Sequence, residues 1–561
     1  MSQASLSLNV QDMASLEEGN PWRQTSTHKV AELLDQVAGR FVHYGDALAF
    51  ETAERVGVSP AEVWLETIFP CVWGLLSLRH TLLARAQSCP TVGELTEAVP
   101  DEQFEPFAGK RALRMLPGNW LESLLLPGFS GYVLISEEEA DLPETQFKEG
   151  LALCLMPFNL TSIGALDIVH LLCNRAKRVV AKVSERAEFT APHLERIFEP
   201  FLKVQALSFA FGGPEVGAWL AAKPEFSEIH LTGGKATAAS VAKVGGGKAL
   251  TFELGGITPA IVFPDAATEP FASLVARQIA FGALANNGQH CVSFQIVVVP
   301  QSRQAELSEK IWAELNVAGT REPRHDGKRM LVDPAAARRL EDLVQASRRE
   351  GARTRPELTA AEDRLFPICL IAGLVPEMRL FREEAFGPVL GVMALPDEVF
   401  FPKALNLANS TLLGGDLGIS IFTSQPNSAA IQEFAVQLRH GMVAINTYPG
   451  VSFATSLPWG PGASGLSGYG WVHNYEFLPG KRIEKVVLSA PLGKKGFGIF
   501  RWEDPWLLNV CGEHSLKLAQ SLTFAAVAYF RKKRWKLAKA LATLSLNIVR
   551  RELSARVADR K

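Results

Sequence analysis

The N-terminal part of the chain carries hydrophobic residues at helical spacing. Apolar positions recur every three or four residues from Val30 to Val42 and from Val63 to Leu83, and proline or glycine separates the segments. This pattern predicts a largely helical region that extends to about residue 125. The apolar segments 63–83 and 516–530 are interrupted by charges or are shorter than the roughly 20 residues that a membrane helix needs, so no span is expected.

From about Gly131 the pattern changes to short apolar runs that alternate with amphipathic stretches. Strand-like runs at 131–136, 151–156 and 178–182 begin this alternation, and a second series starts after Gly256. Such alternation predicts parallel sheets whose faces are both covered by helices. We therefore expect an α/β fold with two tandem domains, of which the first is a Rossmann-like nucleotide-binding domain.

The same patterns divide the chain into four expected parts. The helical region and the nucleotide-binding domain occupy residues 1–255, and the second α/β domain occupies 256–445. A return segment that closes the core follows at 446–490, and a C-terminal extension covers 491–561. The extension contains an aromatic stretch at 496–508 and then a long helical segment predicted from Ser515 to Leu553.

Composition and charge describe an enzyme-sized globular protein. The chain is 47% apolar and 21% charged with a formal charge of −2, so a nucleic-acid partner is not expected. The seven cysteines include no C-x-x-C pair, which disfavours a disulfide framework or a zinc site and favours a reducing compartment. The acidic first 20 residues do not resemble a secretory signal. We expect a cytoplasmic protein with no metal site.

The net charge hides an asymmetry at the C-terminus. Residues 531–561 carry +9 and the preceding 530 residues carry −11. A helically spaced apolar stripe accompanies the basic cluster RKKRWK at 531–536. The stripe consists of Leu518, Leu522, Phe530, Leu537, Leu541, Leu544 and Ile548. Such a helix can make peripheral contact with an anionic membrane, or it can pack its stripe on the body or on a second subunit, and the second interpretation is favoured.

Candidate chemistry centres on Cys291, which lies between a glycine-containing turn and a strongly apolar strand in NNGQHCVSFQIVVV. A cysteine on such a loop can be held rigidly and polarised by neighbouring backbone N–H groups. Glu253 ends an apolar strand ahead of two glycines, and Asn159 ends another strand. The carboxyl ends of parallel strands are where open α/β sheets bind ligands. We therefore expect these three side chains to meet in one cleft.

At this point the chain resembles the aldehyde dehydrogenase superfamily, over about residues 130–490. Nine blocks occur in the family's order: MPFN, AKVSE, GGPEVGAWL with EIHLTGG, FELGG, NNGQHC, EEAFGPVL, GISIFTS, GMVAIN and PWGPGASGLSGYG. The ending resembles a branch with an extended C-terminus. The resemblance implies an aldehyde dehydrogenase-like fold, a small-molecule aldehyde substrate and a homo-oligomer.

The resemblance also implies a mechanism. Cys291, as thiolate, attacks the aldehyde carbonyl, and the oxyanion is held by the Asn159 amide and the backbone N–H of Cys291. Hydride transfer to a nicotinamide leaves a thioester. Glu253 then acts as the general base that activates the hydrolytic water.

The implied cofactor is NAD, with NADP as the alternative. Lys182 would bind ribose hydroxyls of the adenosine half, and Glu185 would accept from the 2′-hydroxyl and repel a 2′-phosphate. Gly233 and Gly234 would let the next helix present its N-terminus to the pyrophosphate. At the nicotinamide end, Glu384 would hold the ribose. Phe158 and Phe386 would also contact the cofactor.

Three positions depart from the family's pattern: Phe158 replaces a tryptophan, Val183 a proline and Gly234 a serine. Two other functions stay open at this stage. A CoA-acylating enzyme on the same fold would pass the thioester to CoA and would need no water-activating base, and Glu253 therefore favours hydrolysis. A non-catalytic scaffold is the second alternative, suggested by the N-terminal helices and the basic tail.

Overall fold

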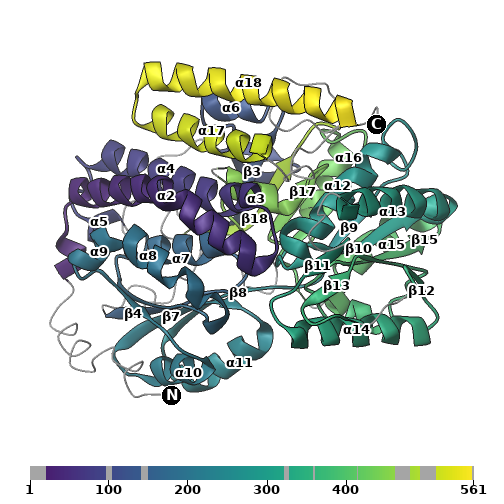
Figure 1. The fold of residues 1–561 in the computed structure, drawn as a ribbon, viewed down its shortest axis with the longest axis horizontal. Coiled ribbons are helices and arrows are strands. Elements are labelled where there is room, and N and C mark those ends of the chain that lie inside the picture. Colours follow the sequence, from purple (N-terminus) through teal and green to yellow (C-terminus); the bar gives the residue numbers. More distant parts are fainter. Residues whose placement is uncertain are drawn as a thin grey trace.

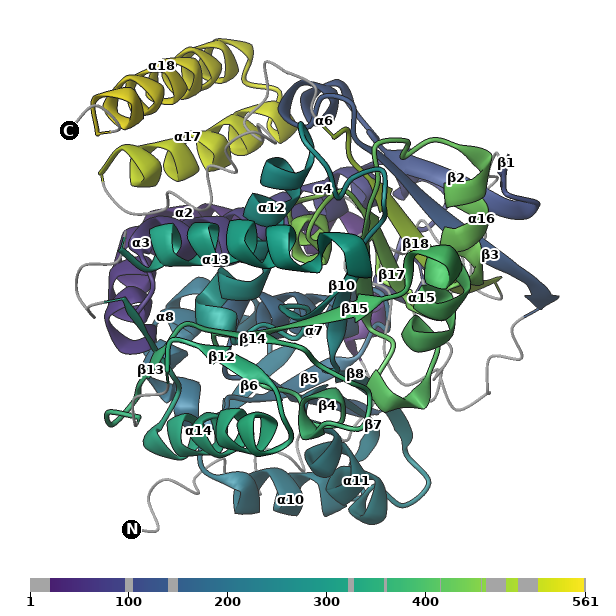
Figure 2. The same cartoon turned by 90° about the vertical axis from the view of Figure 1, so that its right-hand side faces the viewer.

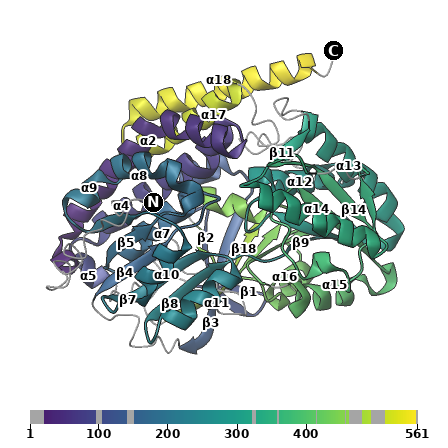
Figure 3. The ribbon, with the colours of Figure 1, turned by 60° about the horizontal axis from the view of Figure 1, so that its bottom comes forward.

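Two sheets organise the molecule, and helices cover both of them (Figures 1 and 3). The structure is a computed structural model that describes residues 21–95, 104–139, 150–320, 327–357, 361–413, 415–455, 457–460, 481–492 and 513–558. Figure 3 shows the two sheet-bearing parts side by side, with α10 (Pro214–Ala222) and α11 (Lys235–Val244) on one and α13 (Gln304–Thr320) and α14 (Pro334–Arg349) on the other. The predicted α/β class is confirmed.

The N-terminal region is built on long packed helices, as the spacing predicts. Its elements are α2 (Thr27–Val56), α3 (Pro60–Val63), the π-helical turn η3 (Trp64–Ile68), α4 (Phe69–Arg85) and α5 (Val92–Leu95). Ser26 caps α2 by accepting a hydrogen bond from the Lys29 N–H at 3.2 Å, and Gly57 ends it with a φ of 76°. The prediction of a largely helical region up to residue 125 holds for these helices and for α6 (Trp120–Leu125). It is wrong between them, where the strands β1 (Glu105–Phe107) and β2 (Lys110–Leu116) form an antiparallel hairpin.

The smaller sheet is entirely parallel in the described part of the chain, with the order β6-β5-β4-β7-β8. Its strands are β4 (Leu151–Leu155), β5 (Arg178–Lys182), β6 (Leu207–Ala210), β7 (Phe226–Gly233) and β8 (Ala249–Leu254). The helices between them are α7 (Thr161–Cys173), α8 (Ala191–Ile197), α9 (Glu199–Lys203), α10 and α11. β4 and β5 are buried along their whole length because helices cover both faces.

The larger sheet is parallel in its centre and antiparallel at its ends. Within the described residues its order is β1-β2-β3-β18-β17-β16-β9-β10-β15-β14-β12. The central strands are β9 (Thr258–Val262), β10 (Phe294–Pro300), β14 (Cys369–Ala372), β15 (Val389–Leu395), β16 (Gly418–Phe422), β17 (Met442–Ile445) and β18 (Lys481–Ser489). Besides α13 and α14, its helices are α12 (Ala272–Leu284), α15 (Phe400–Ala408) and α16 (Ala429–Gln437). At the far edge, β12 (Arg353–Arg355) pairs antiparallel with β14.

One predicted strand lies in a different sheet from the one its position suggests. The apolar run at 131–136 belongs to β3 (Ser130–Glu139), which pairs antiparallel with β2 and β18 in the larger sheet. Local patterning predicts that the run is a strand but gives no information about the strand it pairs with. Along the chain, the change from the smaller to the larger sheet occurs at Gly255–Gly256.

The C-terminal helical segment forms two helices that pack against each other. α17 (Glu513–Phe530) and α18 (Arg534–Ala558) are separated by a turn in which Lys532 has a φ of 53°, so a single long helix is not formed. The stripe residues Leu518, Leu522, Phe530 and Leu544 are buried. Figures 1 and 2 show the pair lying over the N-terminal helices α2 and α4.

The apolar segment Pro60–Arg85 is long and apolar enough to cross a membrane by length and composition. This helical segment combines α3, η3 and α4, and 83% of its most apolar window is buried inside the protein. Its side chains pack on α2, α17 and α7, which is the environment of a core helix.

The packing of α17 on the body gives a stability prediction. Leu518→Ala removes a buried side chain between α17 and the core, and we expect it to lower the free energy of unfolding by about 2–5 kcal/mol. Leu546→Ala, which truncates a 47% exposed side chain on α18, should change it by less than about 0.5 kcal/mol. Urea denaturation followed by circular dichroism measures both variants, and equal destabilisation would contradict the packing described.

Candidate functional site

A cavity of about 830 Å³ lies where the carboxyl ends of β4, β5, β7 and β8 face the part of the chain built on the larger sheet. Every site residue that the sequence predicts lines this cavity. They are Phe158, Asn159, Lys182, Glu185, Gly233, Gly234, Glu253, Cys291, Glu384 and Phe386. They come from both sheet-bearing parts, so the fold gathers groups that are up to 228 residues apart in sequence.

Asn159 is held in place by the loop that carries the cysteine. It follows β4 and precedes α7, and its side-chain amide donates to the Gln289 carbonyl at 3.0 Å. The Asn286 amide donates in return to the Asn159 carbonyl at 3.0 Å. This reciprocal pair fixes the Asn159 amide within the cavity wall beside the cysteine loop.

The loop before Cys291 is a left-handed turn that explains the sequence Asn-Asn-Gly. Asn286, Asn287 and Gly288 have φ values of 48°, 59° and 73°, a conformation that asparagine and glycine adopt most readily. A Cβ at Gly288 would lie 2.4 Å from the Gly387 carbonyl. Glycine is therefore required at position 288 for this turn to approach the loop that contains Gly387.

Side-chain amides tie this turn to distant segments. Asn287 donates to the carbonyls of Val56 at 3.0 Å and Met330 at 3.1 Å. Gln289 donates to Met330 and accepts from the Val332 N–H at 2.8 Å. The turn is buried, and these bonds satisfy backbone groups that water cannot reach.

Cys291 is half-buried at the end of this turn, and its sulfur lies 4.0 Å from Nδ1 of His290. Burial raises the pKa of the Cys291 thiol above its ordinary value, and the carboxylates of Glu384 and Glu253 raise it further. The backbone N–H groups of Cys291 and Val292 act in the opposite direction. Burial lowers the pKa of His290 to about 3, so this ring is neutral and supplies no positive charge to the thiol.

Glu384 lies beside the backbone of Gly255. A Cβ at Gly255 would lie 2.8 Å from a Glu384 carboxylate oxygen, so the glycine leaves room for this side chain. Burial raises the pKa of Glu384 to about 7, and the cations Arg339 and Lys235 partly oppose that shift. Glu384 therefore titrates near neutral pH.

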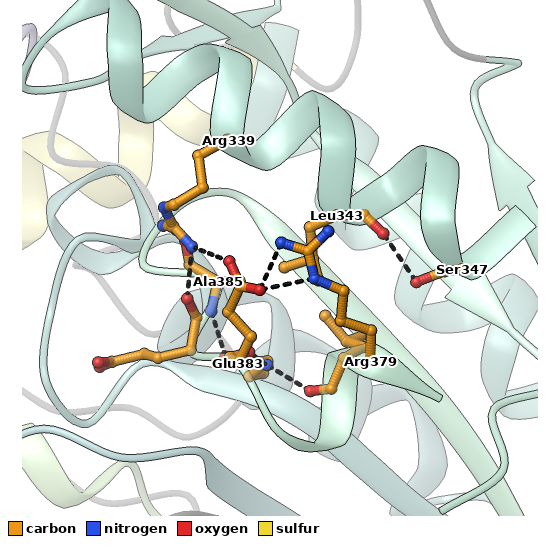
Figure 4. A network of polar contacts seen from close by, with 9 residues as sticks. Arg339, Leu343, Ser347, Arg379, Glu383 and Ala385 are labelled. Carbon is orange, nitrogen blue, oxygen red and sulfur yellow. Dashed lines mark hydrogen bonds and ion pairs between the residues drawn. The ribbon is translucent and has the colours of Figure 1, made fainter. Parts of the chain in front are cut away.

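A polar network holds the loop that carries Glu384 and Phe386. Figure 4 shows Arg339 and Arg379 bonded to the Glu383 carboxylate. The hydrogen bond from Arg339 is 3.2 Å long and the one from Arg379 is 2.7 Å long. Arg339 also donates to the carbonyls of Glu384 and Ala385. The buried Gln295 side chain of β10 accepts from the Ala385 N–H at 2.6 Å and donates to the Glu383 carbonyl at 2.8 Å. The loop that carries Glu384 is therefore held by the two arginines and by Gln295.

The other end of the cavity has the features of a nucleotide cradle. Lys182 is buried at the end of β5, and burial lowers its pKa, while Glu185, Glu188 and Glu215 act in the opposite direction. The N-terminus of α11 has no side-chain cap, and Gly234 precedes it with nothing within 4 Å of the position of a Cβ. Free backbone N–H groups at an open helix N-terminus can bind an anion such as a pyrophosphate.

Several lining residues were not predicted from sequence. Arg186 pairs with Asp333 at 2.7 Å, and its guanidinium carbon lies 5.4 Å from the centre of the Phe158 ring. The Phe158 and Phe386 rings are themselves in edge-to-face contact at 5.8 Å. Arg186 follows Glu185 directly in the K-x-S-E block, and this adjacency was the available signal.

A second, smaller cavity of about 50 Å³ is lined in part by His290, the neighbour of Cys291 in sequence, and Phe453 lines both cavities. Its wall includes His290, Tyr448 and Glu66, a carboxyl whose pKa burial raises well above the ordinary value, with a further contribution from Glu62. Glu66 belongs to the π-helical turn η3, a type of distortion that recurs at functional sites. A single glutamate within the apolar run VWLETIF was its sequence signal.

The described residues contain no group of three or more His, Cys, Asp or Glu side chains that could hold a metal ion. The cavity lining offers one thiol (Cys291), three carboxyls (Glu185, Glu253 and Glu384) and the Asn159 amide, together with an uncapped helix N-terminus that suits an anionic nucleotide.

Two named dehydrogenases are similar to this chain in sequence. An NADP-dependent glyceraldehyde-3-phosphate dehydrogenase of Arabidopsis thaliana is 27% identical over 416 residues, which cover 73% of this chain and 79% of the relative. A peroxisomal aminoaldehyde dehydrogenase of Pisum sativum is 30% identical over 61% of this chain and 68% of the relative.

Solved structures show the same fold. An NAD-dependent aldehyde dehydrogenase from Sinorhizobium meliloti has a TM-score of 0.60 at 20% identity and covers 86% of this chain and 87% of its own. A Mycobacterium tuberculosis aldehyde dehydrogenase complexed with NAD+ has a TM-score of 0.61 at 19% identity, covering 86% of this chain and 90% of its own. The model of the aldehyde dehydrogenase family matches residues 145–478, and the chain therefore belongs to the aldehyde dehydrogenase family.

Proposed function

We propose that this protein oxidises an aldehyde to the carboxylic acid with NAD or NADP as acceptor, through a covalent intermediate on Cys291. The observation that carries the proposal is the convergence of Cys291, Asn159 and Glu253 on one cavity whose far end forms a nucleotide cradle. The relatives support it, since their names include NADP-dependent and amino-aldehyde dehydrogenases and a solved neighbour is NAD-dependent.

In the first step the Cys291 sulfur attacks the carbonyl carbon and the carbonyl oxygen becomes an oxyanion. Asn159 donates a hydrogen bond to this oxygen, and the amide is oriented in advance by its contact with Gln289. A preorganised donor of this kind contributes about 3–4 kcal/mol to transition-state stabilisation. The thiol must lose its proton for the attack, and the nearby Glu384 carboxylate can accept it.

A nicotinamide dinucleotide held by the cradle residues would supply the oxidising chemistry as the hydride acceptor. Cys291 would then carry the acyl group as a thioester. Glu253 removes a proton from water, the resulting nucleophile attacks the thioester carbonyl, and the Cys291 sulfur leaves as the acid forms. This use of a general base favours hydrolysis over transfer of the acyl group to CoA.

The cradle residues fit a dinucleotide. The uncapped N-terminus of α11 faces the cavity and would hold the pyrophosphate, and Lys182 and Glu185 would hold the adenosine ribose. Glu185 is exposed at the cavity rim, where its carboxylate favours a 2′-hydroxyl over a 2′-phosphate, so NAD is the preferred acceptor. Glu384 would accept hydrogen bonds from the nicotinamide ribose.

Replacing the nucleophile gives the most direct test. Cys291→Ala should lower aldehyde-dependent NADH formation by roughly 10⁴-fold or more, because no thiohemiacetal can form. The matched control Cys89→Ala removes a buried thiol outside both cavities and should retain activity. Purified proteins are assayed by absorbance with an aldehyde panel, with and without CoA. NADH that does not depend on Cys291 would refute the proposal, and NADH formed only with CoA would identify an acyl-transferring enzyme.

Replacing the base separates the two half-reactions. Glu253→Gln should lower the steady-state rate by about 10²–10⁴-fold while leaving a rapid first turnover, since hydride transfer precedes the step that needs the base. Stopped-flow absorbance measures the burst, and intact-protein mass spectrometry detects the acylated chain. The exposed Glu433→Gln serves as control. Loss of the burst together with the steady state would place Glu253 in the first half-reaction instead.

Glu384 gives a pH prediction. Its pKa is raised to about 7, so the carboxyl is protonated below pH 7 and ionised above it. An ionised acceptor binds hydroxyls more strongly, and cofactor affinity should increase roughly tenfold as the pH rises through 7. Fluorescence titration between pH 5.5 and 8.5 measures this change. Glu384→Gln should flatten the profile, and an unchanged profile in that variant would assign the titration to another group.

A further inference from the structure

A cationic and aromatic surface surrounds the turn between α17 and α18. We refer to it as the Trp535 patch; it comprises Trp120 and Leu124 of α6 (Trp120–Leu125) together with Lys532, Lys533, Arg534, Trp535, Lys536 and Lys539. Figure 2 shows α6 beside the end of α17 that leads into this turn. The Trp120 ring contacts Tyr529 of α17 edge-to-face at 5.3 Å, which brings the two elements together.

The apolar members of the patch are unusually exposed for large side chains. Trp535 is 83% exposed, Trp120 53% and Leu124 45%. Scattered apolar side chains are common on protein surfaces, but here Trp120 and Leu124 lie one helical turn apart on α6, which contacts the end of α17 that leads into the turn before Trp535. Large exposed apolar side chains on adjoining elements mark an interaction site.

The cations of the patch have no acidic partner among the described residues. Lys532, Lys533, Arg534, Lys536 and Lys539 are all exposed, and no described carboxylate forms an ion pair with them. The sequence contains no Asp or Glu from Arg531 to Arg551. Arg531, at the start of the turn, instead pairs with Asp35 at 3.0 Å and anchors the turn to α2. The remaining positive charge faces outward.

We propose that the Trp535 patch docks on an anionic lipid bilayer. Tryptophan is enriched at membrane interfaces, where its apolar ring and polar N–H are both accommodated, and clusters of four or more lysines and arginines bind acidic headgroups. The patch combines these features on a rigid turn. This mode of membrane binding differs from that of an amphipathic helix that inserts its apolar face into the bilayer. The apolar stripe of α17 and α18 is not available for such insertion, because Leu518, Leu522 and Leu544 are buried inside the protein.

The charge pattern disfavours a second copy of the chain as the occupant. In a twofold interface the same surface meets itself, so five cations would face five cations across the contact. The two exposed tryptophans and Leu124 favour a bilayer over a nucleic acid, since Leu124 offers nothing to a phosphate backbone. This inference concerns a surface outside both cavities and does not depend on the proposed dehydrogenase activity.

Vesicle sedimentation tests the proposal with the full chain. Sucrose-loaded vesicles of phosphatidylcholine with 30% phosphatidylserine should bind the protein at low salt, and vesicles of phosphatidylcholine alone should bind it far more weakly. Lys533→Gln combined with Lys536→Gln should weaken binding about 30-fold, since each cation near an acidic surface contributes about fivefold. Trp535→Ala should weaken it about tenfold, and Trp535→Phe should restore most of the loss.

The control Lys403→Gln removes an exposed cation from α15, outside the patch, and should leave vesicle binding unchanged. Thermal melting of each variant checks that the fold is retained. Absence of binding to acidic vesicles at low salt would overturn the proposal, as would binding that the patch substitutions leave unchanged. If the protein binds a single-stranded oligonucleotide more tightly than acidic vesicles, with the same dependence on Lys533 and Lys536, the patch is a nucleic-acid site. If the patch variants change the sedimentation coefficient in the absence of vesicles, the patch is a site of self-association.

Discussion

The buried left-handed turn at Asn286–Gly288 is the constraint on which the site depends. A turn of this kind exposes backbone N–H and carbonyl groups to an interior that water does not reach, and leaving them unpaired would cost about 1–3 kcal/mol for each group. Here the Glu62 carboxylate accepts from the Asn286 N–H, and the Gln289 carbonyl accepts from the Asn159 amide. The side-chain amides of the turn donate in their own right to backbone carbonyls on the N-terminal helices, on the loop after β4 and at Met330. One local conformation therefore holds three distant parts of the chain against one another and sets Cys291 at the rim of the cavity.

Electrostatics couple this nucleophile to whatever enters the larger cavity. Burial and the carboxylates of Glu253 and Glu384 raise the pKa of the Cys291 thiol, so the sulfur keeps its proton in the unliganded protein. A positively charged ligand near the thiol would reverse this effect, because an opposite charge within a few ångströms favours the ionised form. Burial lowers the pKa of His290 to about 3, so this ring, although next in sequence, carries no positive charge that could stabilise a Cys291 thiolate.

The C-terminal extension is attached to the body mainly by apolar packing, although its charge is opposite to that of the body. The body carries −11 and residues 531–561 carry +9, which suggests an electrostatic attachment. In the structure the attachment is mainly apolar: Trp73 contacts Phe530 at 5.2 Å, Leu518 and Leu522 are buried, and Arg531 adds a pair with Asp35. The five other cations next to the turn stay exposed, because exposed ion pairs contribute too little to draw long side chains onto a surface.

The sequence by itself determined the α/β class and the strands and helices of the smaller sheet, because hydrophobic periodicity is a local property. The positions of Asn159, Glu253 and Cys291 at the ends of strands and turns predicted that they meet in one cleft. The resemblance to the family supplied the other predicted lining residues but not Arg186. Only the tertiary structure decided that β3 joins the larger sheet, that the C-terminal helical segment turns at Lys532, and that Glu66 lines a second cavity together with His290. These outcomes depend on contacts between segments far apart in sequence. The free energy of each such contact depends on which segment is the partner, and the local pattern of residues does not contain that information.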